Sequence, residues 1–398
     1  MPRISNIEAL ARITSRMPMN APSKGGQEQE SLTFLAAHGD ASETLYEFTK
    51  GKLRILSPAF DELPPILATY EVEGGEMPQE VEEWLMDYAR ELEQLESGMA
   101  SPIESNEAEA TADGDMIGPL TLCKWNQGNP YNRNIVNGCY TGCGATSISI
   151  LLKHWADLGY RMGLPATKTY TTKTNKIIVP ALKGVSSFDY DNMPVGKPKT
   201  EREIAAVATI MQHVGYALQS DYKTTGTASN LTSVVNVLKN DLKMGSIKTI
   251  YATNGAKEFE EALKAEIKAA RPVFLGGWNS SNSGGHWFIV DGYDPITNFF
   301  HINWGFGGSY NGWFALTALK VQDYNFSCYK KAVIGIMPSC IKGDVNGDGC
   351  VSVSDVMAIQ QMILNHRYSE AADVNQDGVV DVVDAMKIVQ HILKGGTL

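Results

Sequence analysis

The stretch "NGCYTGCGATSISILLKHW", residues 137–155, places two cysteines four positions apart in front of an apolar run with helical periodicity. Cys143 stands where that helix is expected to begin, whereas Cys139 lies about one turn earlier, in a loop. Unpaired N–H groups at a helix start favour the thiolate, which is the nucleophilic form of cysteine. This position favours Cys143 as a nucleophile.

Metal binding and disulfide formation are the two alternatives for this pair of cysteines. Zinc would need two more Cys or His ligands at suitable spacing, and the sequence lacks a clear second pair. A helical i, i+4 pair is also poor disulfide geometry. The other cysteines, at positions 123, 328, 340 and 350, do not make a disulfide scaffold in so long a chain.

Length and composition indicate a protein of two or three domains. The chain has 398 residues, of which 43% are hydrophobic, enough to bury a sizeable core. No run of eighteen uncharged apolar residues occurs, so we expect no transmembrane helix. The start, "MPRISNIEALARITSRMP", lacks the features of a signal peptide, so the chain either stays inside the cell or has been separated from its signal.

Charge is distributed unevenly along the chain. Residues 60–115 contain 17 acidic residues and one arginine, whereas residues 116–340 contain 22 basic and 14 acidic residues. The two segments could be separate solvated surfaces, or the acidic one could dock onto the basic one, since complementary charge favours docking. The basic surplus lacks interleaved aromatic residues or a Lys/Arg stripe, so we expect no nucleic-acid partner.

The N-terminal third is expected to hold a small sheet, one helix and a linker. Residues 31–59 alternate short apolar runs with turn signals, which predicts a small antiparallel sheet. The segment "MPQEVEEWLMDYARELEQL" predicts a helix with an acidic outer face and an apolar stripe formed by Val81, Trp84, Leu85, Tyr88, Leu92 and Leu95. The segment "ESGMASPIESNEAEATADGD" is small and acidic, which is typical of an exposed linker open to proteolysis.

The region from about 116 to 338 is expected to be α+β. Helices are predicted after Cys143, near 201–215 and at 257–270, and strands dominate 272–337. Helices that come first and strands that come later are typical of the α+β class.

The base that would activate Cys143 should be a histidine, and His286 is the strongest candidate. It lies in "NSGGHWFIVDGYDPITNFFHINWGFGG", residues 282–308, which predicts a β-hairpin turning at "DPITN". Folding that hairpin brings Asn303 opposite His286 to within a residue or two, so an amide could hold the imidazole in its working tautomer. His301 is the fallback base, whereas His154 belongs to the helix after Cys143, and His366 and His391 to the tail.

The C-terminal tail contains a repeated loop with the donor pattern of a calcium site. "DVNGDGCVSVSD" (344–355) and "DVNQDGVVDVVD" (373–384) each have oxygen side chains at loop positions 1, 3, 5, 9 and 12, with glycine at position 6 and a backbone carbonyl at position 7. Asp rather than Glu at position 12 departs from the EF-hand form. The expected ligands of two Ca²⁺ ions are Asp344, Asn346, Asp348, Cys350, Ser352 and Asp355 in the first loop, and Asp373, Asn375, Asp377, Val379, Asp381 and Asp384 in the second.

This duplicated loop, each copy followed by an apolar helix, resembles a dockerin, the module that binds the cohesin of a scaffolding protein. In that family, positions 10 and 11 of each loop often contact the cohesin. The resemblance implies contact residues Val353, Ser354, Val382 and Val383.

Three further blocks resemble the streptopain family (C10) of papain-fold cysteine peptidases. They are "CKWNQGNPYN", "TGCGATSISILLKHW" and "GGHWFIVDGYDPITNFFHINWGFGGSYNGWFAL", in the family's order, although the local papain signature C-G-S/A-C-W/Y is absent. The resemblance implies Cys143 as nucleophile, His286 as general base, Asn303 as its orienter and Trp304 as a shield of that contact. It also implies that Gln127 and the Cys143 N–H stabilise the oxyanion, without a catalytic cofactor.

The preceding segments "ILSPAFDELPPILATYE" and "EVEEWLMDYARELEQL" resemble that family's inhibitory propeptide. The expected organisation is an α+β inhibitory propeptide with its acidic linker (1–112), a papain-like peptidase domain (113–338) and a small all-α dockerin (339–398). This predicts a secreted endopeptidase zymogen, inhibited by its own propeptide, acting on protein substrates and anchored to a cohesin. A non-catalytic binding module and an acyl-transferring enzyme of the same fold remain the alternatives.

Overall fold

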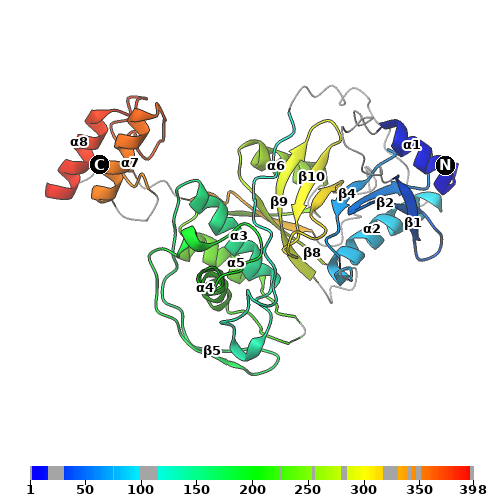
Figure 1. Ribbon diagram of the computed structural model, residues 1–398, viewed down its shortest axis with the longest axis horizontal. Helices are drawn as coiled ribbons and strands as arrows, with labels where there is room; N and C mark the ends of the chain where they lie inside the picture. The colour runs from blue at the N-terminus through cyan, green and yellow to red at the C-terminus, as the bar shows by residue number, and fades with distance from the viewer. Residues whose placement is uncertain are drawn as a thin grey trace. The chain divides into compact units, whose positions relative to one another are not determined.

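A ten-stranded sheet dominates the computed structural model, which describes residues 2–16, 31–74, 76–97, 115–224, 226–252, 256–278, 285–316, 330–338, 342–346 and 351–394. In spatial order its strands are β1 (Thr33–His38), β2 (Leu45–Lys50), β3 (Leu53–Pro58), β4 (Ala68–Glu71), β11 (Gly312–Phe314), β10 (Phe299–Asn303), β9 (Gly285–Asp294), β8 (Val273–Trp278), β12 (Lys331–Ile334) and β7 (Lys248–Tyr251). Strands from the N-terminal segment and strands from residues 248–334 therefore lie in one sheet (Figure 1).

The sequence prediction for residues 31–59 is correct for the strands but wrong for the extent of the sheet. β1, β2 and β3 form the expected antiparallel meander, but β3 pairs with β4, and β4 pairs with β11. Gly312 makes the last junction possible, since a Cβ there would lie 2.1 Å from the Thr69 carbonyl oxygen. The small sheet is thus one end of a larger one, because the β11 edge accepts β4.

Helices α1 (Asn6–Arg16) and α2 (Gln79–Glu96) pack on opposite faces of this sheet. Successive residues of β2 divide between the two faces, as strand geometry requires: Tyr46 packs with the α1 cluster and Leu45 with the α2 cluster. α6 (Ala256–Lys268) belongs to the same core cluster as α2. The predicted α2 stripe is confirmed, since all six of its apolar residues are buried, whereas α1 was not predicted.

The chain divides into two compact units. One contains Met1–Leu120 and Thr249–Ile334, and the other contains Thr121–Lys248 and Gly335–Leu398. The first unit therefore combines the expected propeptide with the strand-rich part of the expected peptidase domain. This grouping follows from the continuous sheet.

The second unit is built mainly of helices. They are η2 (Val136–Gly138), α3 (Cys143–Asp157), η3 (Tyr190–Asn192), α4 (Glu201–Ala217), α5 (Leu231–Asn236) and the π-helical η4 (Val237–Asp241), with a small pair of strands, β5 (Tyr170–Thr171) and β6 (Ile178–Val179). Thr200 and Glu203 form a capping box that fixes the start of α4. The helices predicted after Cys143, near 201–215 and at 257–270 are α3, α4 and α6, so the α+β class is confirmed.

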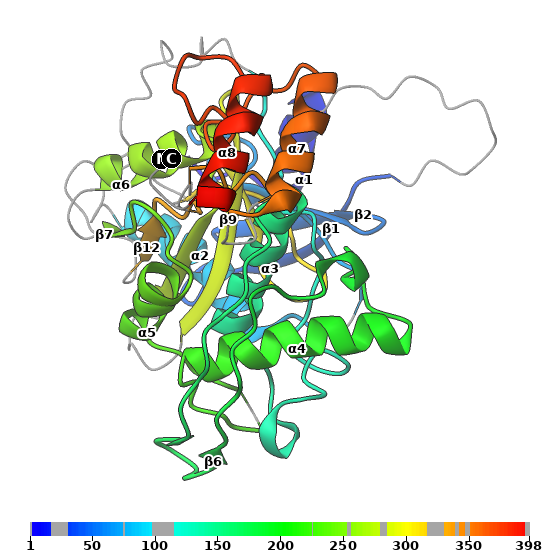
Figure 2. The same ribbon diagram turned by 90° about the vertical axis from the view of Figure 1, so that its left-hand side faces the viewer.

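The tail forms two helices with a small core of their own. α7 (Val353–Leu364) and α8 (Val382–Lys394) lie side by side (Figure 2). Ile359, Ala385 and Ile388 from these helices pack on Ala372 and Val374 from the connecting segment. Each repeat thus has the expected loop-plus-helix order.

None of the helices described here is both long and apolar enough to cross a membrane.

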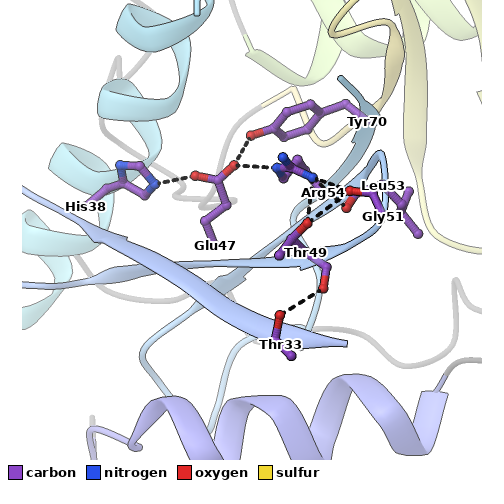
Figure 3. Close-up of polar contacts among 8 residues, drawn as sticks. All are labelled: Thr33, His38, Glu47, Thr49, Gly51, Leu53, Arg54 and Tyr70. Carbon is purple, nitrogen blue, oxygen red and sulfur yellow. Dashed lines mark hydrogen bonds and ion pairs between the residues drawn. The ribbon is translucent and has the colours of Figure 1, made fainter. Parts of the chain in front are cut away.

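A buried polar network joins the strands of the N-terminal sheet. The Glu47 carboxylate accepts a hydrogen bond of 2.6 Å from the Tyr70 hydroxyl, and its other oxygen lies 2.9 Å from His38 Nε2 (Figure 3). Arg54 Nε lies 3.8 Å from the same carboxylate, and Arg54 Nη1 donates to Thr49 Oγ1 across the hairpin. Burial alone would raise the pKa of Glu47, but the bonds from His38 and Tyr70 together lower it. The folded sheet therefore favours the charged form of the Glu47 carboxylate.

We predict that the N-terminal sheet loosens in acid because of Glu47. A folded-state pKa below the ordinary 4.5 means that Glu47 contributes stability at pH above 4.5, and that this contribution is lost as the pH falls through the folded value. Glu47→Gln should cost about 1–3 kcal/mol near neutral pH. Hydrogen exchange in β2 and β3, corrected for intrinsic rates, measures this, with the exposed Glu62→Gln as the control. Equal exchange in the two variants would contradict the assignment.

Candidate active site

Cys143 is the first residue of α3. Gly142 precedes it at φ 89°, a backbone conformation that suits glycine, and its carbonyl accepts the N–H of Thr146. The N–H groups of the first helical turn have no acceptor one turn earlier within the helix. The predicted placement of Cys143 at a helix start is confirmed, so its backbone N–H points into the region where an anion is favoured.

The loop before Cys143 is held in place by contacts within its own unit. Gln127 provides its carbonyl oxygen to the Thr141 N–H at 3.0 Å, and Thr227 donates to the Tyr140 carbonyl at 2.8 Å. Asn132 Nδ2 donates to the Cys139 carbonyl at 3.0 Å. These bonds attach the Gln127 segment to the segment that leads into Cys143. The predicted oxyanion donor and nucleophile thus belong to neighbouring, mutually bonded loops.

Gly144, which follows Cys143, is closely packed against Ser229 and Leu218. A Cβ at this position would lie 2.1 Å from Ser229 Oγ and 3.6 Å from Leu218. Ser229 thus occupies the space that a side chain at position 144 would need.

The other two described cysteines have environments that suit packing rather than chemistry. Cys123, Cys139 and Cys143 are all thiols without a disulfide bond. Burial raises the pKa of Cys123 to about 12, and burial also raises the pKa of Cys139. Both stay protonated at neutral pH, so neither is a competing nucleophile.

His286 lies in the first unit, near the start of β9, and is 3% exposed. Its Nε2 lies 2.8 Å from the backbone carbonyl oxygen of Trp304. A carbonyl can only accept, so this contact assigns a proton to Nε2 and leaves the Nδ1 lone pair of the neutral ring available. The ring also stacks on Phe306, with centroids 4.7 Å apart. Residues near the end of β10 therefore fix both the orientation and the tautomer of the imidazole.

The predicted hairpin is confirmed, but its register differs from the expected one. β9 and β10 are joined at residues 295–298, where the Asp294 carboxylate accepts from Ile296 N–H and Thr297 Oγ1. The register of the pair, with a bulge between His301 and Ile302, places Asn303 opposite Ile289, three residues from His286. Asn303 Oδ1 accepts the N–H of Gly305. Its role as orienter of His286 stays a prediction.

His301, the fallback base, has a different environment. Its Nδ1 lies 2.6 Å from a carboxylate oxygen of the fully buried Asp291. Its ring packs edge-on against Trp313, with centroids 5.3 Å apart. This buried pair explains the conformation of β9 and β10 and favours a structural role.

Helix α2 packs over the surface that bears His286. Trp84 meets Trp304 and Phe288 edge-on, with ring centroids 5.5 and 5.6 Å apart. Glu80 Oε1 lies 3.9 Å from His286 Nδ1. The Lys330 ammonium lies 4.2 Å from the Trp84 ring centroid and donates to the Leu316 carbonyl. Glu80 and Trp84 of α2 thus line the same small pocket as the candidate base.

Acidic residues of α2 lie beside the basic residue Lys330 at this contact. Burial raises the pKa of Asp87 on α2, and the positive charges of Lys330 and Arg90 oppose that rise. Glu80, Glu83 and Asp87 all line the same small pocket as His286 and Lys330. Neither Glu80 nor Lys330 was singled out from the sequence; the excess of acid in residues 60–115 was the signal that pointed to such a contact.

The second repeated loop of the tail is described almost completely. Asp373 accepts the N–H groups of Asp377 and Gly378, and Asp384 accepts those of Asn375 and Asp381. These bonds tie loop positions 1 and 12 to the turn between them. All five side-chain donors of this loop, together with the carbonyl of Val379, are oxygen ligands of the kind that Ca²⁺ prefers.

The first loop is described only in part. Asp355 accepts from the N–H groups of Val345, Asn346 and Ser352, as Asp384 does from its own loop, while Asp344 is buried. Asp348 and Cys350 lie outside the described residues. Within the described ranges, no three His, Cys, Asp or Glu side chains converge as a metal site. The calcium sites therefore rest on the donor pattern and the loop conformation.

Comparison with known protein families finds two separate matches along the chain. Residues 125–314 match the Peptidase C10 family, and residues 342–393 match the dockerin type I domain. The chain is 26% identical over 367 residues to the thiol protease/hemagglutinin PrtT of Porphyromonas gingivalis, covering 83% of this chain and 40% of that protein. It is 27% identical over 244 residues to streptopain of Streptococcus pyogenes, covering 54% of this chain and 60% of that protein. The chain thus spans only part of these relatives.

Among solved structures, a prointerpain A fragment of Prevotella intermedia has a similar fold. The TM-score is 0.64 at 21% sequence identity, and the match covers 78% of this chain and 99% of that one. A match of this extent includes more than the segment assigned to the peptidase family. It confirms the papain-like fold expected from the sequence blocks.

Proposed function

Because this chain carries a domain of the Peptidase C10 family and a type I dockerin domain, we propose that it is a cysteine endopeptidase made as an inactive precursor and anchored through its tail. The proposal is supported by the local geometry of two residues. Cys143 lies at the start of α3, and the contact with the Trp304 carbonyl sets the tautomer of His286. The boundaries proposed for the three parts are residues 1–112, 113–338 and 339–398.

Peptide hydrolysis through these residues has two halves. The His286 imidazole takes the thiol proton, the Cys143 sulfur attacks the peptide carbonyl, and the imidazolium then protonates the leaving amine to give a thioester. Water, deprotonated by the same imidazole, attacks the thioester and releases the acid. Gln127 and the Cys143 N–H stabilise the oxyanion of both tetrahedral intermediates, and Asn303 and Trp304 hold the imidazole.

Latency follows from the contact of α2 with His286. The Nδ1 atom, whose lone pair the reaction needs, faces the Glu80 carboxylate, and Trp84 closes the surface beside it. A carboxylate at this distance competes with the thiolate for the Nδ1 proton, while the helix blocks the approach of a substrate chain. Removal of α2 relieves both effects.

The Cys143→Ala variant tests the catalytic assignment. Purified wild-type chain, incubated under reducing conditions, should lose its α1–α2 segment and gain hydrolysis of casein, whereas Cys143→Ala should stay intact and lose activity by about 10³-fold or more. Mass and casein hydrolysis are followed together, with Cys139→Ala as the matched thiol control.

Three results would redirect the assignment. Self-processing of the pure Cys143→Ala chain would exclude autocatalysis by this residue. If wild type stays inactive even after an added protease removes α2, the chain is a binding module. Products joined to an added amine in place of free acids would identify an acyl-transferring enzyme.

The tail is proposed to bind two Ca²⁺ ions and to dock on a cohesin outside the cell. Val353, Val382 and Val383, at loop positions 10 and 11, are exposed apolar residues, as a protein-binding surface requires. Ser354 is exposed beside Val353 and completes the set of contact positions. The oxygen donors of the loops provide the chemistry for the ions.

We predict that Asp373→Ala weakens calcium binding by at least about tenfold, because it removes the position 1 ligand. The same variant should lose affinity for a type I cohesin that the wild-type chain binds in calcium and releases in chelator. Calorimetry with Ca²⁺ alone and then with the cohesin measures both effects, and Glu370→Gln, an exposed acid outside the loop, is the control. Unchanged calcium affinity in Asp373→Ala would contradict the ligand assignment.

A further inference from the structure

The pocket beside His286 is filled by one side chain of α2. It is lined by Glu80, Glu83, Trp84 and Asp87 from the helix and by Gly277, Gly285, His286, Phe288, Trp304 and Lys330 from the rest of the first unit. The space left over is about 30 Å³, room for about one water molecule. Trp84 therefore occupies a site that the remaining residues form around it.

That site has the features of an aromatic-binding box. The rings of Trp304 and Phe288 stand at 81° and 88° to the Trp84 ring, the edge-to-face geometry that aromatic pairs prefer. The Lys330 ammonium lies 4.2 Å from the centroid of the Trp84 ring, within cation–π range. Gly277 has no side chain to fill the box, and a Cβ there would lie 3.9 Å from the Trp84 ring.

Two walls of the box are also held by contacts outside α2. The Asn311 side chain accepts the backbone N–H of Trp304, and the Trp304 carbonyl contacts His286. Lys330 donates to the Leu316 carbonyl within the same unit. These contacts would remain after loss of α2, and they keep an aromatic ring and a cation at the walls of the box.

The chemistry of the reaction says which part of a substrate lies beside His286. The imidazolium gives its proton to the leaving amine, so the residues that follow the scissile bond must pass next to this side chain. A pocket that shares His286 as a wall is then reached by a side chain of the leaving segment.

We infer that the box vacated by Trp84 is a substrate subsite for an aromatic side chain on the leaving-group side of the scissile bond, with Lys330 as its specificity-determining residue. This inference rests on the proposed peptidase function and goes beyond it by naming a substrate class. Trp84 is then a stand-in for substrate, held in the box by the helix. Lys330 selects an aromatic ring over an aliphatic side chain of similar reach, because only a π face attracts the ammonium.

A series of quenched fluorescent peptides tests the inference on the full chain after it has processed itself. The peptides differ at a single position, the first, second or third residue after the scissile bond, which carries Trp, Phe, Leu or Ala. At one of these positions kcat/KM should be roughly 5- to 30-fold higher for Trp than for Leu, the range expected from a desolvated cation–π contact. Lys330→Met should reduce this Trp-to-Leu ratio toward one, and Lys330→Arg, which keeps a cation over the ring, should restore it.

The outcomes distinguish a failure of the subsite inference from a failure of the proposed peptidase function. If the wild-type chain cleaves the peptides without an aromatic preference at any of the three positions, the subsite is wrong and the peptidase stands. A Trp-to-Leu ratio that Lys330→Met leaves unchanged removes Lys330 from the assignment, and if that variant does not fold, the wild-type ratio decides alone. If no peptide is cleaved by wild type, as with Cys143→Ala, the proposed function and the subsite are both overturned.

Discussion

The packing of Trp84 against Trp304, Phe288 and Lys330 is the contact that joins α2 to the part of the first unit that bears His286. It places α2 over the sheet, and the helix in turn buries the apolar surface of β8, β9 and β10. The same helix brings Glu80 Oε1 to 3.9 Å from His286 Nδ1. The contact that packs the helix and the latency proposed above therefore involve the same residues.

The continuous sheet adds a second attachment for the N-terminal segment. β4 pairs with β11 through backbone hydrogen bonds that need no particular side chain, and Gly312 lets the two strands approach. Tyr70 on β4 stacks on Phe314 of β11 and also donates to Glu47. The polar network of the N-terminal sheet is thus connected to the strand next to the β9–β10 hairpin. Both a helix and a strand therefore attach the N-terminal segment to the rest of the first unit.

Sequence reasoning succeeded where the determinants are local. The α2 stripe, the hairpin turn at residues 294–298, the start of α3 at Cys143 and the loop-plus-helix repeats all follow from short patterns. It failed where distant segments meet. The junction of β4 with β11, the register of Asn303 and the contact of Lys330 with Trp84 depend on which segments pack together. No periodicity in a single segment contains that information.

At the candidate site, too, some features follow from local sequence patterns and others depend on distant segments. Cys143 was predicted as nucleophile from the helix start and His286 as base from the hairpin around it, and both roles stay predictions. The backbone carbonyl that sets the imidazole tautomer could not be foreseen, because carbonyls carry no sequence signal. Trp304 was expected as a shield, and the structure adds its carbonyl as the partner of His286. The close approach of Gly144 to Ser229 could not be foreseen either, because it depends on a residue 85 positions away.

The reactivity of His286 toward diethyl pyrocarbonate in the full-length Cys143→Ala chain tests most directly that Trp84 shields the base. Wild-type packing buries the imidazole, so modification should be slow, and Trp84→Ala should accelerate it because about 3–5 kcal/mol of packing is lost beside the ring. Leu92→Ala is the control, since Leu92 is buried on the same helix but does not line the pocket. Rapid modification of His286 with Trp84 in place, or equal rates in the two helix variants, would contradict the account.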